Sequence, residues 1–368
     1  MDRRSFLKAL GTALAGCSVA SVAEAAIPLM WDVSRHDAEA RIPSMKMIGM
    51  GESGLALMQS MLVGVEALPS HVQADYLGIR FDGRVTRGIQ PPDLEWTVPP
   101  NYHRWHEVTD DLQNVAAMRQ RIPSMERELS EYVRGADIVF LLVSIDNAMS
   151  FAACDAAARI ARESGALTVA LIGVPYGEHC EDFLDDSLRV ASHDAVNRIL
   201  READCVVAMD GYWGGSTIES VIWHWGQFSM PHSLVLAAWV ESTTRGNLDR
   251  LKKVLLKSGK AIHGFGLGRN VEEAVKEAFG EPHRWFDSYG KTVTAASGIV
   301  LVSGHPESVN NMFNEVQAEL ARIEPLEIPH WGGKPEMLIL AVPDDRLKAD
   351  GYFTVDIIST GIEFVGES

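Results

Sequence analysis

Three glycines near the start of the chain have the spacing of a phosphate-binding turn. Gly49, Gly51 and Gly54 follow an apolar strand predicted at 45–48. A Gly-x-Gly-x-x-Gly turn brings backbone N–H groups close to the phosphates of a dinucleotide, with a helix N-terminus facing the anion. The acid that binds the ribose is expected about 20 residues further on, and the nearest strand-end acid, Asp82, lies well beyond that point. A dinucleotide-dependent oxidoreductase would therefore rest on these glycines alone.

A second strand–loop–helix unit has the position of a phosphate loop without its residues. The apolar strand 136–143 is followed by Asp146–Ala152, which read Asp-Asn-Ala-Met-Ser-Phe-Ala, and then by a predicted helix. A phosphate there needs bare backbone N–H groups and the close approach that glycine allows. This stretch contains no glycine, carries a carboxylate at Asp146 and adds bulk at Met149 and Phe151. We expect it to be a poor phosphate cradle.

The beginning of the chain has the charge, apolar core and cleavage motif of an export signal, in that order. Arg3 and Arg4 precede Ser-Phe-Leu-Lys as in a twin-arginine signal, and an Ala-x-Ala sequence ends at Ala25. Residues 14–17 also match a lipoprotein processing box, in which Cys17 would carry the lipid. We therefore expect a periplasmic or membrane-anchored protein outside the cytoplasm. The alternative is an uncleaved amphipathic helix on a cytoplasmic protein, and the choice between the two processing sites stays open.

The composition is that of a globular protein with an acidic excess. Hydrophobic residues make up 46% of the chain, charged residues make up 23%, and the formal net charge is −17. That charge would repel nucleic-acid phosphates and anionic lipid headgroups, so neither is an expected partner. Membrane association is expected only through a lipid on Cys17.

No metal site is predicted from the histidines and cysteines. His103 and His106 could share a helical face for zinc, but no third ligand accompanies them, and a surface loop explains them better. Cys154 and Cys180 follow neighbouring predicted strands, where they could pair in an oxidising compartment or remain separate thiols. Cys205 lies in an apolar strand pattern, which predicts a core position.

Strands and helices alternate along the chain, which predicts a doubly wound, mostly parallel α/β sheet. In the first half we expect strands at 45–48, 74–81, 136–143, 165–172 and 203–209, and helices at 55–65, 110–134, 153–164 and 184–201. In the second half we expect strands at 234–240, 260–266, 292–302, 337–342 and 352–359, and helices at 248–258, 270–279 and 306–323. The predicted organisation is a signal at 1–25, a nucleotide-binding-type domain at 45–210, a central connecting helix at 211–232 and a smaller α+β domain at 233–368.

Several segments resemble the tubulin/FtsZ family of GTP-dependent filament proteins, in the order and spacing of that family. Arg134–Phe140 is similar to the strand that enters the FtsZ phosphate loop, and Glu163–Ala170 is similar to the next strand. Gly259–Gly266 resembles the strand after the catalytic loop, while Ala341–Lys348 and Val355–Gly361 resemble the last strand pair. The resemblance implies the tubulin/FtsZ fold.

The resemblance also implies where a nucleotide would lie. In this family a glycine-rich turn and a Gly-Gly-Gly-Thr-Gly-Thr-Gly loop cradle the phosphates of GTP, and the second loop falls on Asp146–Ala152. Glu52 and Asp146 would each oppose a triphosphate by on the order of 1 kcal/mol. We therefore expect no cofactor, and GTP if any nucleotide is bound. The vestigial nucleotide-binding positions are Gly49, Gly51, Gly54, Asp146, Asn147, Ser150 and Asp210.

The catalytic loop implied by the resemblance has lost its last acid. FtsZ-like subunits supply an Asn-x-Asp-x-x-Asp loop that activates water on the GTP of a neighbour. Counting back from the following strand puts Arg245, Asn247 and Arg250 at these positions. Sliding the alignment to match Asn247 and Asp249 puts Lys252 at the last acid instead. In both alignments that position is a base, which cannot accept a proton from water, so no catalytic residue is predicted.

We expect a non-catalytic structural or interaction protein, a pseudo-GTPase outside the cytoplasm. The alternative is a GTP-binding, filament-forming GTPase with an uncleaved N-terminus. The resemblance places basic residues, Arg250 and Lys252 among them, on one end of the subunit and Glu52 and Asp146 on the other. Opposite charges at the two ends would favour head-to-tail self-association without a nucleotide. The alternative for the basic residues is a solvated helix face.

Overall fold

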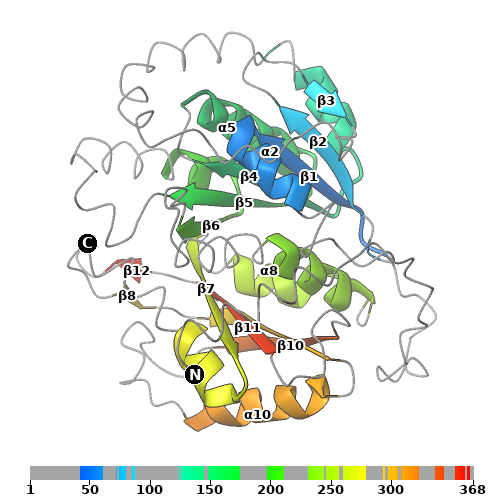
Figure 1. The fold of residues 1–368 in the computed structure, drawn as a ribbon. Coiled ribbons are helices and arrows are strands. Elements are labelled where there is room, and N and C mark those ends of the chain that lie inside the picture. Colours follow the sequence, from blue (N-terminus) through cyan, green and yellow to red (C-terminus); the bar gives the residue numbers. More distant parts are fainter. Residues whose placement is uncertain are drawn as a thin grey trace, which may run out of the picture.

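The computed structural model describes residues 42–60, 72, 74–79, 85–87, 123, 126–144, 148–174, 197–210, 231–243, 246–256, 260–278, 293–294, 297–305, 308–322, 336–343, 353–360 and 363–364. Most of the described strands form one sheet that runs through the centre of the molecule, and helices cover both of its faces (Figure 1). The predicted signal peptide lies outside these residues.

Ten strands form the large sheet, in the order β10-β9-β11-β7-β6-β5-β4-β1-β2-β3. They are β1 (Met45–Met50), β2 (Asp75–Ile79), β3 (Val85–Arg87), β4 (Ile138–Ser144), β5 (Leu167–Val174), β6 (Cys205–Asp210), β7 (Lys260–Gly268), β9 (Ser297–Gly304), β10 (Glu336–Pro343) and β11 (Phe353–Thr360). Two short strands, β8 (Val293–Thr294) and β12 (Glu363–Phe364), form a separate antiparallel pair.

The pairing is mostly parallel, as the alternation of elements predicted. The strands from β2 through β1, β4, β5 and β6 to β7 are all parallel, and β10 is parallel to β9. Only β3 and β11, among the strands of this described sheet, run against their neighbours. Parallel strands covered by helices on both faces read as continuous apolar runs, and this explains why the central strands were recognisable in the sequence.

Helices α2 (Gly51–Ser60) and α5 (Ala148–Glu163) cover opposite faces of the first half of the sheet. The buried side chains of α2 share a core cluster with Met47 of β1, whereas those of α5 share a second cluster with Ile48. Successive residues of a strand point to opposite faces. The doubly wound architecture is therefore confirmed.

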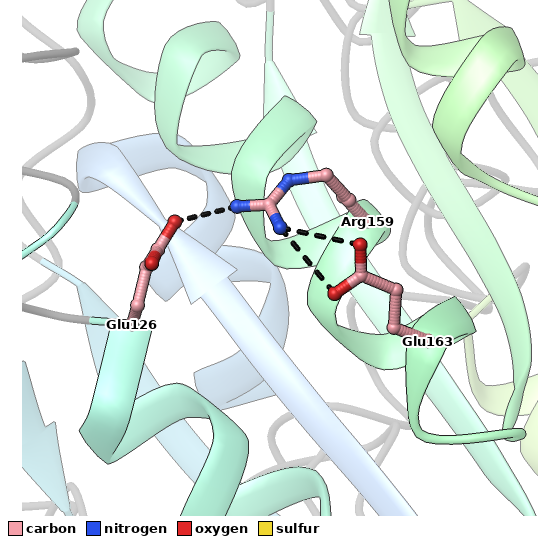
Figure 2. A network of polar contacts seen from close by, with 3 residues as sticks. All are labelled: Glu126, Arg159 and Glu163. Atoms are coloured by element: carbon pink, nitrogen blue, oxygen red, sulfur yellow. Dashed lines mark hydrogen bonds and ion pairs between the residues drawn. The ribbon is translucent and has the colours of Figure 1, made fainter.

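Helix 126–133 packs beside α5 on the same face and is joined to it by an arginine (Figure 2). The guanidinium of Arg159 contacts Glu126 at 2.5 Å and Glu163 at 3.3 Å. Hydrogen bonds to Glu126 and then to Glu163 raise the pKa of Arg159. All three side chains are partly exposed, so each pair contributes about 1 kcal/mol at most. The contact fixes the relative orientation of two helices whose packing is mainly apolar.

Aspartates at the amino edge of the sheet satisfy backbone groups where the ladders begin. Asp137 precedes β4 and accepts a hydrogen bond of 2.8 Å from the N–H of Ser44. Asp204 precedes β6 and accepts one of 2.9 Å from the N–H of Thr168. The same device thus sets the register of two strand pairs, because an amide at the start of a ladder otherwise needs water or a cap.

The sheet and its core continue from the first half of the chain into the second. β6 and β7 are paired in parallel from Val206–Lys260 to Ala208–Ile262. One core cluster contains Phe140 of β4, Leu251 and Leu301, so it spans both halves. Its members in the second half come largely from helix 231–243, helix α8 (Asp249–Leu255) and strands β9 and β10. Helix 271–278 and α10 (Val309–Arg322) cover the other face.

One predicted strand is wrong. Residues 234–240 were expected to be a strand, but they lie in a helix that spans 231–243. All but one of these seven residues are buried, with Trp239 half-buried. A short apolar run that is buried on all sides has no period to separate a strand from a helix. The helix crosses the predicted boundary at 232/233, and residues 211–230 of the predicted connecting helix lie outside the described residues.

Candidate functional site

The carboxyl edge of the parallel strands is the position where a doubly wound sheet binds ligands. The chain leaves β1 toward β2 on one side and returns to β4 on the other, so the strand order reverses between β1 and β4. Helices α2 and α5 start at the carboxyl ends of these two strands, on opposite faces of the sheet. Ligands of open α/β sheets bind outside the strand ends at such a switch point, with anions at the helix N-termini.

The three predicted glycines lie where β1 passes directly into α2, a junction called here the glycine turn: Gly49 is in the strand, and Gly51 and Gly54 are in the first turn of the helix. Each glycine has a local structural reason. A Cβ on Gly49 would lie 2.8 Å from the carbonyl oxygen of Gly54. A Cβ on Gly54 would lie 2.2 Å from the carbonyl oxygen of Leu142 on β4. Gly51 has φ +69°, in the left-handed region that side chains disfavour. The turn therefore brings helix α2 against β4 more closely than any other residue type would allow.

Helix α5 begins earlier than predicted. It starts at Ala148 instead of residue 153, so residues 148–152 of the expected loop are helical. Without glycine this stretch contains good helix formers, which extend the helix toward the strand. Ser150 therefore lies in the first turn of α5, which holds no acidic side chain. Asp210 is the last residue of β6 at the same edge, while Asp146 and Asn147 lie outside the described residues.

The loop before α8 is built as a helix-to-helix turn. The N–H of Gly246 donates to the carbonyl of Ser242 at 2.7 Å, and its φ is +74°, so Gly246 ends helix 231–243. The side-chain oxygen of Asn247 accepts a hydrogen bond of 3.0 Å from the N–H of Asp249. Asn247 thus satisfies a backbone donor at the start of α8. Arg245 lies outside the described residues.

Arg250 is bound to a buried acid that the sequence did not single out. Its Nε lies 3.7 Å from Oε1 of Glu241, and the side chains are 46% and 1% exposed, respectively. Glu241 follows the apolar run 234–240, and this was the signal that could have found it. An acid directly after such a run is either solvated at a strand end or buried beside a base, and only the helical geometry selects the second.

The far end of α8 is also fixed by a buried polar contact. The hydroxyl of Thr360 donates to the carbonyl of Val254 at 2.9 Å, and it lies 3.0 Å from the hydroxyl of Ser297. Thr360 pairs with Ala261 near the amino end of β7. Helix α8 therefore lies toward the amino edge of the parallel strands, and the glycine turn lies at their carboxyl edge. The two predicted site regions are not brought together within one chain.

The two described cysteines are both buried. Cys154 is a free and fully buried thiol, so the disulfide alternative for it is not formed. Burial, followed by the charge of Asp204, raises the pKa of Cys205 to about 12, and burial also raises that of Cys154.

In the part of the chain that the structure describes, no group of three or more His, Cys, Asp or Glu residues could hold a metal ion. Over the same residues, no helix is long and apolar enough to cross a membrane.

Comparisons with known proteins agree with the fold. No protein-family model matches the sequence, and no curated protein is significantly similar to it. Among solved structures, a mutant FtsZ from M. jannaschii matches with TM-score 0.57 and 15% identity, covering 87% of this chain and 91% of that chain. An FtsZ from M. jannaschii, described as an empty dimer, gives TM-score 0.57, 15% identity and coverage of 87% and 88%. CetZ from Methanosaeta thermophila gives TM-score 0.54, 12% identity and coverage of 87% for both chains. The chain therefore has the fold of the tubulin/FtsZ proteins.

Proposed function

We propose that this chain is a non-catalytic structural protein of the tubulin/FtsZ fold that associates head to tail without hydrolysing GTP. The observation that carries the proposal is the pair formed by Arg250 and Glu241. A water-activating acid must be exposed at the subunit surface to reach the nucleotide of a neighbour. Here Arg250 stands at the surface and Glu241, 1% exposed, is held inside the subunit.

The carboxyl edge supports the same proposal. The stretch that would cradle phosphates contains no glycine and is helical from Ala148 onward. A phosphate loop uses glycines so that the anion can approach its backbone N–H groups closely, and this stretch offers none. We therefore propose that GTP is not a substrate and that no cofactor is needed for assembly.

Self-association is supported by the charges and by the structural relatives. One of the similar structures is an FtsZ dimer. In this chain α8 carries Arg250, Lys252 and Lys253, while the overall charge is −17. A basic end on an acidic subunit favours contact with a second copy, and a head-to-tail contact can continue into short filaments.

Sedimentation of the chain from residue 26 to 368 tests this function. We expect self-association at tens of micromolar in low salt, weaker association in high salt, and no change on adding GTP. Calorimetry should detect no GTP binding at micromolar concentration. A strictly monomeric protein in low salt contradicts the assembly proposal, and micromolar GTP affinity contradicts the nucleotide-free proposal.

A second candidate function is favoured by the intact glycine turn. Gly49, Gly51 and Gly54 keep the close approach and the left-handed backbone that a phosphate-binding turn requires. Asp249 is also exposed at the start of α8. Under this alternative the chain is a GTP-binding filament-forming GTPase. GTP binding that Gly51→Asp abolishes, together with phosphate release that Asp249→Asn abolishes, would establish it.

We also propose that the protein works outside the cytoplasm, after twin-arginine export. The support is the order of Arg3, Arg4, apolar core and cleavage motif in the sequence. Replacing both arginines by lysine should leave full-length precursor in the cytoplasm of fractionated cells. Cys17→Ser should release the protein from membranes only if that cysteine carries a lipid. Wild-type protein found solely in the cytoplasm at full length contradicts export.

A further inference from the structure

Two contacts hold α8 between helix 231–243 and the sheet. At its N-terminal end, Arg250 pairs with Glu241 of helix 231–243 at 3.7 Å. At its C-terminal end, Thr360 of β11 donates to Val254 at 2.9 Å. The buried side chains of Leu251, Val254 and Leu255 pack α8 against the core. The guanidinium at the surface is therefore mounted on a helix that is fixed at both ends.

Glu241 is buried and Arg250 is partly exposed, so the pair joins the interior of the subunit to its surface. A carboxylate with 1% exposure loses nearly all of its hydration. The free-energy penalty of this desolvation is offset only by charged or polar groups that stay close to the carboxylate. Arg250 forms an ion pair with this acid at 3.7 Å, which is longer than a hydrogen bond, while 46% of its side chain remains exposed. An arginine carries five N–H donors in a rigid planar fork, and the ion pair at Nε involves only one of them.

We propose that Glu241 is a positioning residue that orients Arg250 to receive a carboxylate of a second copy of this chain. The inference rests on the self-association proposed above and names the contact that gives it specificity. A fork fixed in advance binds a carboxylate in a bidentate manner and loses less side-chain entropy than a mobile lysine does. The second copy is the favoured occupant because α8 is locally basic, with Arg250, Lys252 and Lys253, while the rest of the chain is acidic, with 50 acidic residues against 33 lysines and arginines overall.

Removing the charge of Glu241 tests the proposal, because positioning and long-range electrostatics predict opposite changes in the strength of self-association. Glu241→Gln removes a negative charge from beside the basic end, so long-range electrostatics alone would strengthen attraction to an acidic partner. Positioning predicts the opposite, because Arg250 loses the acid that orients it. We expect Glu241→Gln to weaken self-association by about threefold to tenfold. The amide is similar in shape to the carboxylate, and thermal unfolding should confirm that the variant is folded.

Glu315→Gln is the matched control. Glu315 is an exposed acid on α10, which covers the face of the sheet opposite α8, so the change removes the same charge without touching the surroundings of Arg250. This control should leave association unchanged or strengthen it. Arg250→Lys keeps the charge but loses the fork, and should weaken association about as much as Arg250→Gln does. Sedimentation of all four variants and wild type at several salt concentrations gives the dissociation constants and their salt dependence.

The outcomes separate the inference from the function on which it rests. If the wild-type chain stays monomeric, both are overturned. If the wild type associates but Glu241→Gln matches Glu315→Gln, only the positioning role of Glu241 is overturned. Should Glu241→Gln fail to fold, Arg250→Lys decides alone: association equal to wild type overturns the inference, and association as weak as that of Arg250→Gln supports it.

Discussion

The glycine turn between β1 and α2 differs from the turn before α8 in how much of its sequence is required by packing. At the glycine turn, Gly49 and Gly54 are needed because a Cβ would collide with backbone oxygens at 2.8 and 2.2 Å. At the other turn, Asn247 and Arg250 make contacts through their side chains. Packing alone therefore explains the glycines at the first turn, so they do not by themselves indicate phosphate binding. At the second turn the side chains make the contacts, so the choice of residues there bears on the function of that surface.

Gly54→Ala should have the largest effect on stability. Its Cβ would lie 2.2 Å from the backbone oxygen of Leu142, so helix α2 must move away from β4. We expect a loss of about 3 kcal/mol in the free energy of unfolding, measured with urea. Gly165→Ala is the matched control, because Gly165 has φ +85° and a Cβ added there would meet nothing within 4 Å. That control should cost about 1 kcal/mol, and equal losses would contradict the role of close packing.

Thr360→Val tests the anchoring of α8. The change keeps a β-branched side chain in the strand but removes the hydrogen bonds to Val254 and Ser297. Because the carbonyl of Val254 loses a buried donor, we expect a loss of about 1.5 kcal/mol. Thr360→Ser restores the hydroxyl and should recover most of the hydrogen-bond contribution. If Thr360→Val and Thr360→Ser are equally destabilised, the methyl group and not the hydroxyl holds this end of α8.

The two buried thiols, on α5 and β6 in the half of the sheet that contains the glycine turn, make the stability of this half depend on pH. Burial raises the pKa of Cys205 to about 12 and also raises that of Cys154 on α5. The unfolded chain therefore releases thiol protons first, and the stability from these groups is complete below about pH 8 and falls as pH rises further. We expect a loss of about 1 kcal/mol between about pH 8 and 9. Replacing both cysteines by alanine should remove most of this slope, and an unchanged slope would assign it to other groups.

Asn247→Ala should have the smallest effect. The side-chain oxygen of Asn247 satisfies the N–H of Asp249 on an exposed turn, so its loss should cost about 0.5 kcal/mol. Asn247→Asp keeps the acceptor and should be close to wild type in stability. A much larger loss of stability for Asn247→Ala, together with weaker self-association, would mean that Asn247 does more than cap the N–H of Asp249.

The sequence predicted the fold better than the site for a physical reason. Parallel strands buried on both faces, such as β4 and β5, are apolar throughout and need no knowledge of distant contacts. The run 234–240 is equally apolar, but its burial on all sides removed the period that would have marked it as a helix. The role of Glu241 was not predicted for the same reason. Its partner Arg250 lies beyond the turn that follows helix 231–243, and the two side chains come close only because residues 231–243 are helical.

The pairing of β6 with β7 has a consequence for dividing the protein. A chain cut between residues 210 and 231 would leave β6 with an open edge in one fragment and β7 with an open edge in the other. Each fragment would also expose its share of the common core, including Phe140 in the first and Leu301 in the second. Neither fragment should remain soluble alone. Co-expressed fragments should instead associate into one folded complex. A cut between residues 210 and 231 would therefore suit a split reporter whose signal depends on folding.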